Sequence, residues 1–102
     1  MNIDSIVKTR TLPISFTIEF DNGKSKKIDL KLKSMKVKTI RKLAALRQTD
    51  DESSIREMIK LILNNNTSNF KIKDELIDEL TFEQMQAIGQ TYTDWLKINQ
   101  KN

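Results

Sequence analysis

Hydrophobic and polar residues alternate strictly over two short stretches in the first third of the chain. The apolar positions of these stretches are Ile14, Phe16, Ile18 and Phe20, followed by Ile28, Leu30 and Leu32. A period of two is typical of strands that bury one face. The stretches are separated by Asp21-Asn22-Gly23, a combination of residues that favours a turn. The pattern therefore predicts a β-hairpin.

The length of the turn follows from the residues that would face each other. An Asn22-Gly23 pair often forms a two-residue turn, but that turn would place Phe16 opposite Asp29. A three-residue loop places Phe16 opposite Ile28, so that the apolar side chains share one face and Gly23 takes a left-handed conformation. Because an isolated hairpin is only marginally stable in water, we expect helices to cover its apolar face.

The remainder of the chain carries the pattern of amphipathic helices. Apolar residues recur three and four positions apart, which is the spacing that lines one face of a helix. This spacing predicts helices over residues 37–48, 53–63, 74–80 and 81–98. Asp50-Asp51-Glu52 offers capping groups at the start of the second of these helices. The asparagine-rich run 64–69 predicts a mobile polar connection.

The last of these helices has the best-marked start. Thr81 and Gln84 fit a capping box, in which each side chain satisfies the other residue's backbone N–H group. Phe82 then begins an apolar face that continues through Leu96. Gly89 lies within the helix, where a glycine costs about 1 kcal/mol relative to alanine. It either allows the close approach of another backbone or is a tolerated irregularity, and the sequence leaves both interpretations open.

Length and composition limit these elements to one domain. The 102 residues are 37% hydrophobic and include only two glycines and one proline, which describes a helix-rich chain with a modest core. We predict an α+β fold in which an N-terminal β-hairpin packs against a small bundle of three to four α-helices. Residues 13–98 form the predicted core, residues 1–12 a mobile N-terminal segment, and residues 99–102 a tail.

The residue types exclude several classes of function. The chain has no cysteine and no histidine, which removes disulfides, thiolate and imidazole metal sites and the usual nucleophile–base pairs of hydrolases. The longest apolar run, Leu43–Leu46, is far too short for a membrane span. We therefore expect an intracellular, non-enzymatic protein without a cofactor or a metal.

Carboxylates cluster in the second half of the chain. Asp74 and Asp78 share one face of the predicted third helix, as do Glu75 and Glu79. Such a pair could hold a divalent cation or transfer a proton. A solvated, acidic start of a helix is the more common outcome, and we favour it here.

Charge is divided unequally along the chain. Residues 1–48 carry 12 Lys/Arg against 4 Asp/Glu, whereas residues 49–102 carry 6 against 10. The basic half suits non-specific contact with nucleic acid, and it equally permits contact with the acidic half of another copy. The candidate basic contact surface comprises Lys27, Lys31, Lys33, Lys36 and Lys38. An AT-rich genome would produce the same abundance of lysine, isoleucine and asparagine without any functional cause.

Three stretches of the chain together resemble one known family. They are Asp21-Asn22-Gly23-Lys24 between two apolar strands, the basic segment 32–43, and the acidic segment 78–84, which reads Asp-Glu-Leu-Thr-Phe-Glu-Gln. Their order over residues 13–98, together with the chain length, resembles the small tail assembly chaperones of long-tailed bacteriophages and prophages.

The resemblance implies a role in virion assembly without catalysis. Such chaperones coat the aggregation-prone tape measure protein in the cytoplasm of the bacterial host, help to recruit tail-tube subunits, and are absent from the mature virion. This chaperone role implies that copies associate with one another along an extended client, and therefore that the protein is a homo-oligomer. The alternative is a small basic nucleic-acid-binding or regulatory protein of phage origin, and no membrane contact is expected in either case.

An amphipathic helix that lies against a client helix would supply the binding surface implied by this resemblance. Tyr92, Trp95 and Leu96, together with Gly89, are the candidate partner-binding residues, because aromatic side chains near a chain end are good anchors. The alternative is that these side chains cap the core over the hairpin, and this second interpretation is marginally preferred.

A second trait of the family concerns the last residues. Many of these genes yield a longer product when ribosomes slip back by one nucleotide near the stop codon. Gln100-Lys101-Asn102 can be encoded CAA AAA AAC, which contains the slip sequence A AAA AAC in the required frame. The protein sequence thus permits a programmed frameshift, and other synonymous codons would abolish it.

Overall fold

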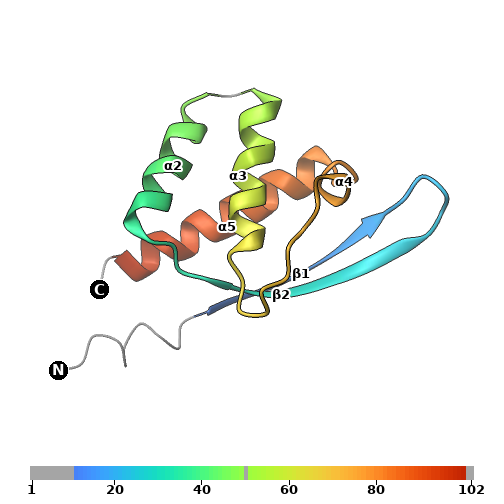
Figure 1. The fold of residues 1–102 in the computed structure, drawn as a ribbon, viewed down its shortest axis with the longest axis horizontal. Coiled ribbons are helices and arrows are strands. Elements are labelled where there is room, and N and C mark those ends of the chain that lie inside the picture. Colours follow the sequence, from blue (N-terminus) through green and yellow to red (C-terminus); the bar gives the residue numbers. More distant parts are fainter. Residues whose placement is uncertain (1–10, 50, 101–102) are drawn as a thin grey trace.

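The structure, a computed structural model, describes residues 11–49 and 51–100, with side chains up to Leu96. A β-hairpin is followed by four helices, and the helices lie to one side of the hairpin (Figure 1). The elements are β1 (Thr11–Glu19), β2 (Ser25–Lys33), α2 (Val37–Arg47), α3 (Glu52–Asn64), α4 (Asp74–Ile77) and α5 (Phe82–Gln100). The predicted α+β fold is confirmed.

The predicted N-terminal segment and tail fall largely outside the described ranges. Residues 1–10 and 101–102 are not described. Thr11 and Leu12, at the end of the segment predicted to be mobile, form the beginning of β1. The last helix runs to Gln100, beyond its predicted end at residue 98.

The hairpin has the predicted three-residue loop and register. Phe16 lies opposite Ile28 in the antiparallel pair. The Phe20 amide donates to the Lys24 carbonyl at 2.8 Å, which closes the loop, and Gly23 adopts a positive φ of 85°. A side chain would be strained at this φ, which explains the glycine.

The two faces of the hairpin differ in exposure. On the inner face Ile18, Leu30 and Leu32 are buried. On the outer face the alternate residues of β2, from Ser25 to Lys33, are all exposed. Each strand therefore buries one face, as its alternating pattern predicts.

The edge of β2 is extended by the asparagine-rich connection that follows α3. The Lys33 amide donates to the Asn65 carbonyl at 2.8 Å, and the Thr67 amide donates to the Lys31 carbonyl at 3.0 Å. An isolated antiparallel bridge at Asn66 lies between these two hydrogen bonds. This short segment thus covers part of an edge that would otherwise present unpaired backbone groups.

The Asn66 side chain is enclosed by the connection, and the residue is only 1% exposed. Its Nδ2 donates to the carbonyls of Leu63 and Phe70 at 2.8 and 2.7 Å. Its Oδ1 accepts from the amides of Ser68 and Phe70, both at 3.0 Å. The expectation of a mobile polar loop does not fit this part of the connection, because the side chain bonds to the backbone on both sides of it.

The starts of α3 and α5 follow the predicted capping signals. Asp51 accepts from the Ser54 amide at 2.7 Å at the start of α3. At the start of α5 the Thr81 hydroxyl accepts from the Gln84 amide, and the Gln84 side chain accepts from the Thr81 amide, both at 3.0 Å. Gln84 Nε2 also donates to the Thr17 carbonyl at 2.7 Å, so the same side chain links α5 to β1.

The core lies between the hairpin and the helices, with α3 at its centre. Ile59, Ile62 and Leu63 of α3 are fully buried. The helix α5 packs against α3 at Gly89, where an added Cβ would lie 3.2 Å from Met58 Cε and 3.6 Å from Ile59 Cδ1. The close approach that Gly89 allows is therefore to side chains of α3.

The helix α2 is the least integrated of the longer helices. It packs on α3, and Leu43 is its one buried residue. Its N-cap residue, Lys36, makes no side-chain capping bond. Val37, which begins the helix, is 66% exposed. The predicted helix therefore forms, but a large part of its surface stays uncovered.

Candidate interaction surfaces

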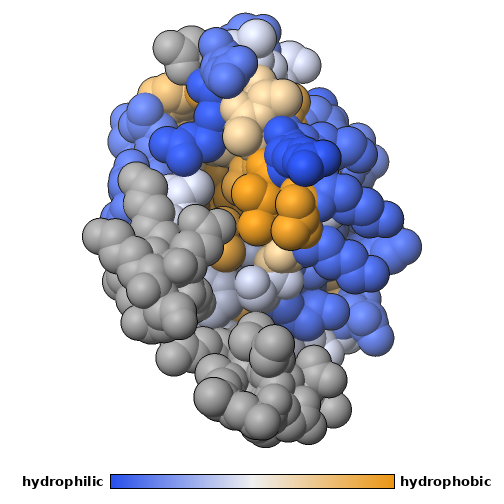
Figure 2. Space-filling model, turned by 90° about the vertical axis from the view of Figure 1, so that its left-hand side faces the viewer, coloured by the Kyte–Doolittle hydropathy of each residue, from blue (hydrophilic) through white to orange (hydrophobic). Residues whose placement is uncertain are grey.

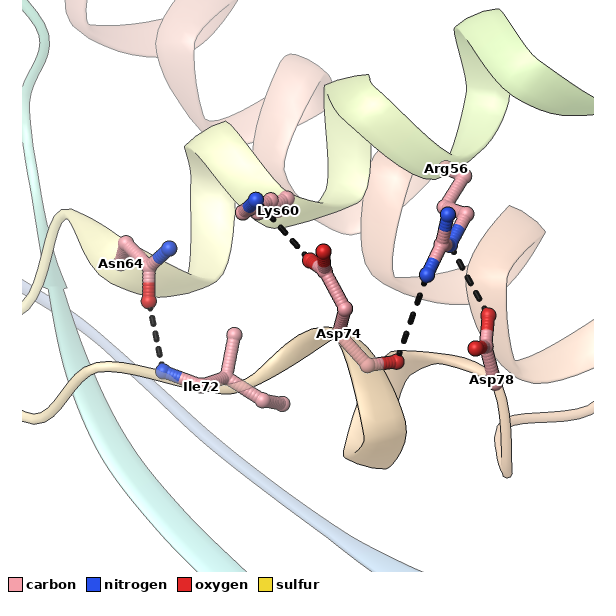
Figure 3. A network of polar contacts seen from close by, with 6 residues as sticks. All are labelled: Arg56, Lys60, Asn64, Ile72, Asp74 and Asp78. Atoms are coloured by element: carbon pink, nitrogen blue, oxygen red, sulfur yellow. Dashed lines mark hydrogen bonds and ion pairs between the residues drawn. The ribbon is translucent and has the colours of Figure 1, made fainter.

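The aspartates of the predicted third helix hold α4 against α3. Asp78 Oδ1 lies 2.9 Å from Arg56 Nε, and Asp74 Oδ1 lies 2.9 Å from Lys60 Nζ (Figure 3). The Arg56 guanidinium also donates to the Asp74 carbonyl at 3.5 Å. The hydrogen bond from Lys60 lowers the pKa of Asp74, and the same contact raises the pKa of Lys60. These two carboxylates thus form ion pairs with basic side chains of α3.

Four residues of α5 are predicted to bind a partner, and three of them are buried. Tyr92 is fully buried, Leu96 is 7% exposed, and Gly89 faces α3. The Tyr92 hydroxyl donates to the Lys33 carbonyl at 2.6 Å, and burial raises the pKa of this tyrosine. Trp95 is half-buried, with its ring centroid 5.7 Å from that of Tyr92. These positions favour the core interpretation, and only part of Trp95 is open to a partner.

Phe82 departs from the predicted apolar face of α5. The pattern places it with the inward residues, yet it is 49% exposed. Phe82 and Gly89 are seven positions apart and therefore lie on the same side of the helix. Phe82 lies two turns before Gly89, the position at which α5 packs closely against Met58 and Ile59 of α3.

An open groove of about 590 Å³ lies between the turn that joins α2 to α3 and the first half of α5. Its apolar lining comes from Leu46, Ile55, Met58, Met85 and Gly89. Its polar lining includes Arg47, Thr49, Gln86, Gln90 and Thr93. The space stays open because α2 packs on α3, and because Gly89 has no side chain to fill it.

Sequence reasoning missed this groove. Its lining comes from the end of α2, the start of α3 and the middle of α5, so no single periodic pattern reveals it. The signal that pointed towards it was Gly89, for which a close approach was one of two open interpretations. The structure shows which helix approaches, and a sequence alone does not.

The predicted basic surface is exposed and spread over two elements. Its lysines on the outer face of β2 and at the start of α2 are Lys27, Lys31, Lys33, Lys36 and Lys38. Asp29 lies among them on the same face of β2. Phe16 and Phe20 pack against the core from the inner face, so they are not placed to stack on bases beside these lysines. The surface offers phosphate contacts only.

Comparisons of this chain with known protein families, with curated proteins and with solved structures found no match. Within residues 11–49 and 51–100, no group of three or more His, Cys, Asp or Glu residues could hold a metal ion. No helix in the same ranges combines the length and the hydropathy that crossing a membrane requires. Function must therefore be inferred from the surfaces described above.

Proposed function

We propose that this chain is a non-enzymatic tail assembly chaperone of a long-tailed bacteriophage or prophage. In this role it binds and solubilises the tape measure protein and helps to recruit tail-tube subunits. The observation that supports the proposal is the open groove of about 590 Å³ beside α5, to which three helices contribute apolar side chains. The resemblance of three sequence stretches to this family supplies the identity of the client.

Two methionines give the groove an adaptable lining. Met58 and Met85 both line it, and unbranched thioether side chains rearrange around different apolar partners at low cost. The polar side chains around them are mostly uncharged, as Gln86 and Gln90 illustrate. A long amphipathic client presents a different set of apolar side chains at each turn, and such a groove would bind many of those turns. Each contact would be weak, so that the chaperone can be released as the tube grows.

Leu46 is the best position at which to disrupt the groove. It is half-buried, it lines the groove, and among the described side chains it is not one of those that pack against the core cluster. An aspartate there would place an unpaired charge in the groove while leaving the core unchanged. Its neighbour Ala45 is exposed and does not line the groove, so Ala45→Asp is a control with the same change of charge.

The test is co-expression with the tape measure protein encoded by the same phage or prophage genome. We expect the wild-type chain and the Ala45→Asp variant to keep that protein in the soluble fraction. We expect Leu46→Asp to reduce the soluble client by about tenfold, which corresponds to about 1.4 kcal/mol of lost binding. Equal activity of the two variants would exclude the groove as the client site. A wild-type chain without any effect would contradict the chaperone proposal itself.

The coding DNA across Gln100–Asn102 gives an independent test. The heptamer A AAA AAC, followed by an overlapping frame shifted back by one nucleotide and then by a very long helical gene, would support the proposal. Codons that break the heptamer would remove the frameshift and leave a simpler chaperone. Neighbouring genes unrelated to tails would contradict the proposal.

The exposed lysines favour nucleic-acid binding as a second candidate function. Lys27, Lys31 and Lys33 lie along one face of a strand and could follow a phosphate backbone. Such binding would weaken steeply as salt rises, because counterion release drives it. A Lys27→Glu and Lys31→Glu double variant should then lose duplex DNA at low salt, while Leu46→Asp should not. No binding of DNA or RNA by the wild type at low salt would exclude this second candidate.

A further inference from the structure

Two large apolar side chains are exposed in the described part of the chain. Val37 is 66% exposed and Phe82 is 49% exposed. Each is the first residue of a helix, Val37 of α2 and Phe82 of α5. In Figure 1, α2 lies at one side of the helical layer, whereas α5 begins at the other side, next to α4. The two side chains therefore cannot cover each other within one copy.

Val37 lies in basic surroundings. Lys36 and Lys38 are its neighbours in sequence, and Arg41 follows one turn later on the same side of the helix, and all three are exposed. Half-buried Ile40 continues the apolar surface from Val37. Figure 2 views the side of the molecule that carries α2, and it shows hydrophobic surface bordered by hydrophilic residues. We call residues 36–38, 40 and 41 the basic patch.

Phe82 lies in acidic surroundings. Glu83 follows it and is exposed, and Glu79 precedes it by three positions and is half-buried. Asp78 precedes Glu79 in the sequence, with 59% of its side chain exposed, although Arg56 neutralises part of its charge. We call residues 78, 79, 82 and 83 the acidic patch. The two patches thus combine a similar apolar centre with charges of opposite sign.

We propose that the basic patch of one copy binds the acidic patch of a second copy. Val37 and Phe82 would pack against each other, and the lysines and arginine around Val37 would face the carboxylates around Phe82. Because the two patches are different surfaces, the contact is heterologous, and each copy uses one patch towards each of two neighbours. Repetition of this contact gives a ring or an open chain of copies.

We assign a second copy of the chain as the binding partner because the two patches of this one sequence carry opposite charges. The unequal division of charge along the chain places a net excess of cations in its first half and of anions in its second half. Complementary charge steers association and excludes the like-charged pairing of two basic or two acidic patches. Neither Val37 nor Phe82 lines the groove beside α5. A variant can therefore lose the contact between copies and still bind the client, or the reverse.

Each patch is small, so the association should be weak and depend on concentration. Exposed charges at the contact would be screened as salt rises, and the association should weaken accordingly. The measurement is sedimentation velocity of the full chain over a wide range of protein concentration, at low and at high salt. We expect the wild type to form species larger than a dimer at low salt.

Complementation between two variants distinguishes this contact from a symmetric one. Val37→Ser and Phe82→Ser should each be monomeric, because each loses one of the two patches. An equimolar mixture of them should form a dimer and nothing larger, since the intact acidic patch of the first can bind the intact basic patch of the second. Circular dichroism of each variant checks that the fold is retained.

Charge reversal provides a second readout that does not alter the apolar centres. Glu83→Lys should abolish association, and adding Arg41→Glu to the same chain should restore part of it. Asp21→Lys, in the exposed hairpin loop, changes the net charge equally and is the matched control. A wild type that is monomeric at all concentrations would overturn the proposal. So would association that survives both Val37→Ser and Phe82→Ser, or variants that fail to complement each other.

Discussion

The end of β2 and the start of α2 are only a few residues apart, yet they are held in very different ways. Lys33 is fixed through its backbone, because its carbonyl accepts from the Tyr92 hydroxyl at 2.6 Å and from Asn65 Nδ2 at 2.9 Å. Its amide donates to the Asn65 carbonyl at 2.8 Å. Val37, by contrast, is 66% exposed, and the helix that it begins has no side-chain cap.

Under the proposed contact between copies, stability and binding depend on different parts of the fold. Polar groups that are held by several hydrogen bonds specify one arrangement, and they are costly to disturb. An uncovered helix face contributes little to the stability of the single copy, so its residues are free to serve a contact with another molecule. Disruption of the first region should therefore lower the free energy of unfolding, whereas disruption of the second should leave it nearly unchanged.

The largest loss of stability should follow from removing the Asn66 side chain. Asn66→Ala would leave two backbone amides and two carbonyls without this partner in a buried site, at a cost of about 2–4 kcal/mol. Urea unfolding followed by circular dichroism measures the free energy of unfolding. Ser68→Ala is the control in the same connection, because its side chain is exposed, and it should change stability by less than about 0.5 kcal/mol.

A smaller loss should follow from Tyr92→Phe. This change removes one donor to the Lys33 carbonyl, which keeps its bond from Asn65, so the expected cost is about 1 kcal/mol. Burial raises the pKa of Tyr92, so the folded chain keeps the phenolic proton at a pH where the unfolded chain has lost it. Wild-type stability should therefore fall as pH rises above the ordinary tyrosine range. The difference between wild type and variant should shrink over that alkaline window, and a constant difference would contradict this account.

A still smaller effect should follow from Asp74→Asn, because the pair with Lys60 is exposed to solvent. The pKa of Asp74 is lowered in the folded chain, so its contribution is present above the ordinary aspartate range and is lost as pH falls through the lowered value. Unfolding curves of wild type and variant should thus differ at neutral pH and coincide in acid. A difference that persists in acid would show that the asparagine disturbs α4 in another way.

The smallest effect on stability should come from Val37→Ser. An exposed residue at the start of a helix contributes little to burial, so we expect a change within about 0.5 kcal/mol. The same variant should nevertheless lose the association of copies, and this combination is the sharpest test of the contrast. A large loss of stability in the monomer would mean that α2 is part of the cooperative core after all.

Local sequence rules were sufficient for the hairpin and the helix starts. The loop length followed from the requirement that Phe16 lie opposite Ile28, so that the apolar side chains share one face. The Thr81–Gln84 capping box formed with both of its predicted hydrogen bonds. These features depend on residues close in sequence or on a strict period of two. The prediction of an α+β fold follows from them directly.

Features that depend on tertiary contact were not predictable in the same way. The polar run that contains Asn66 looked like a loose loop, because its composition does not reveal that the side chain would be enclosed by backbone. Tyr92 and Leu96 were candidates for partner binding, and the sequence cannot tell an inward aromatic face from an outward one. Phe82 followed the period of the buried face but lies before the point where α3 packs against α5.

The hydrogen bonds between Lys33 and Asn65 also have a consequence for how the chain tolerates change in length. They join two points that enclose all of α2 and α3, so the turn between these helices lies inside a loop already closed at its base. The entropic cost of closing such a loop grows slowly, by about 0.6 kcal/mol for each doubling of its length. Residues inserted beside Thr49 would therefore be inexpensive. Insertions could therefore lengthen the turn at the outer end of α2 without changing the β-sheet that closes the loop at its base.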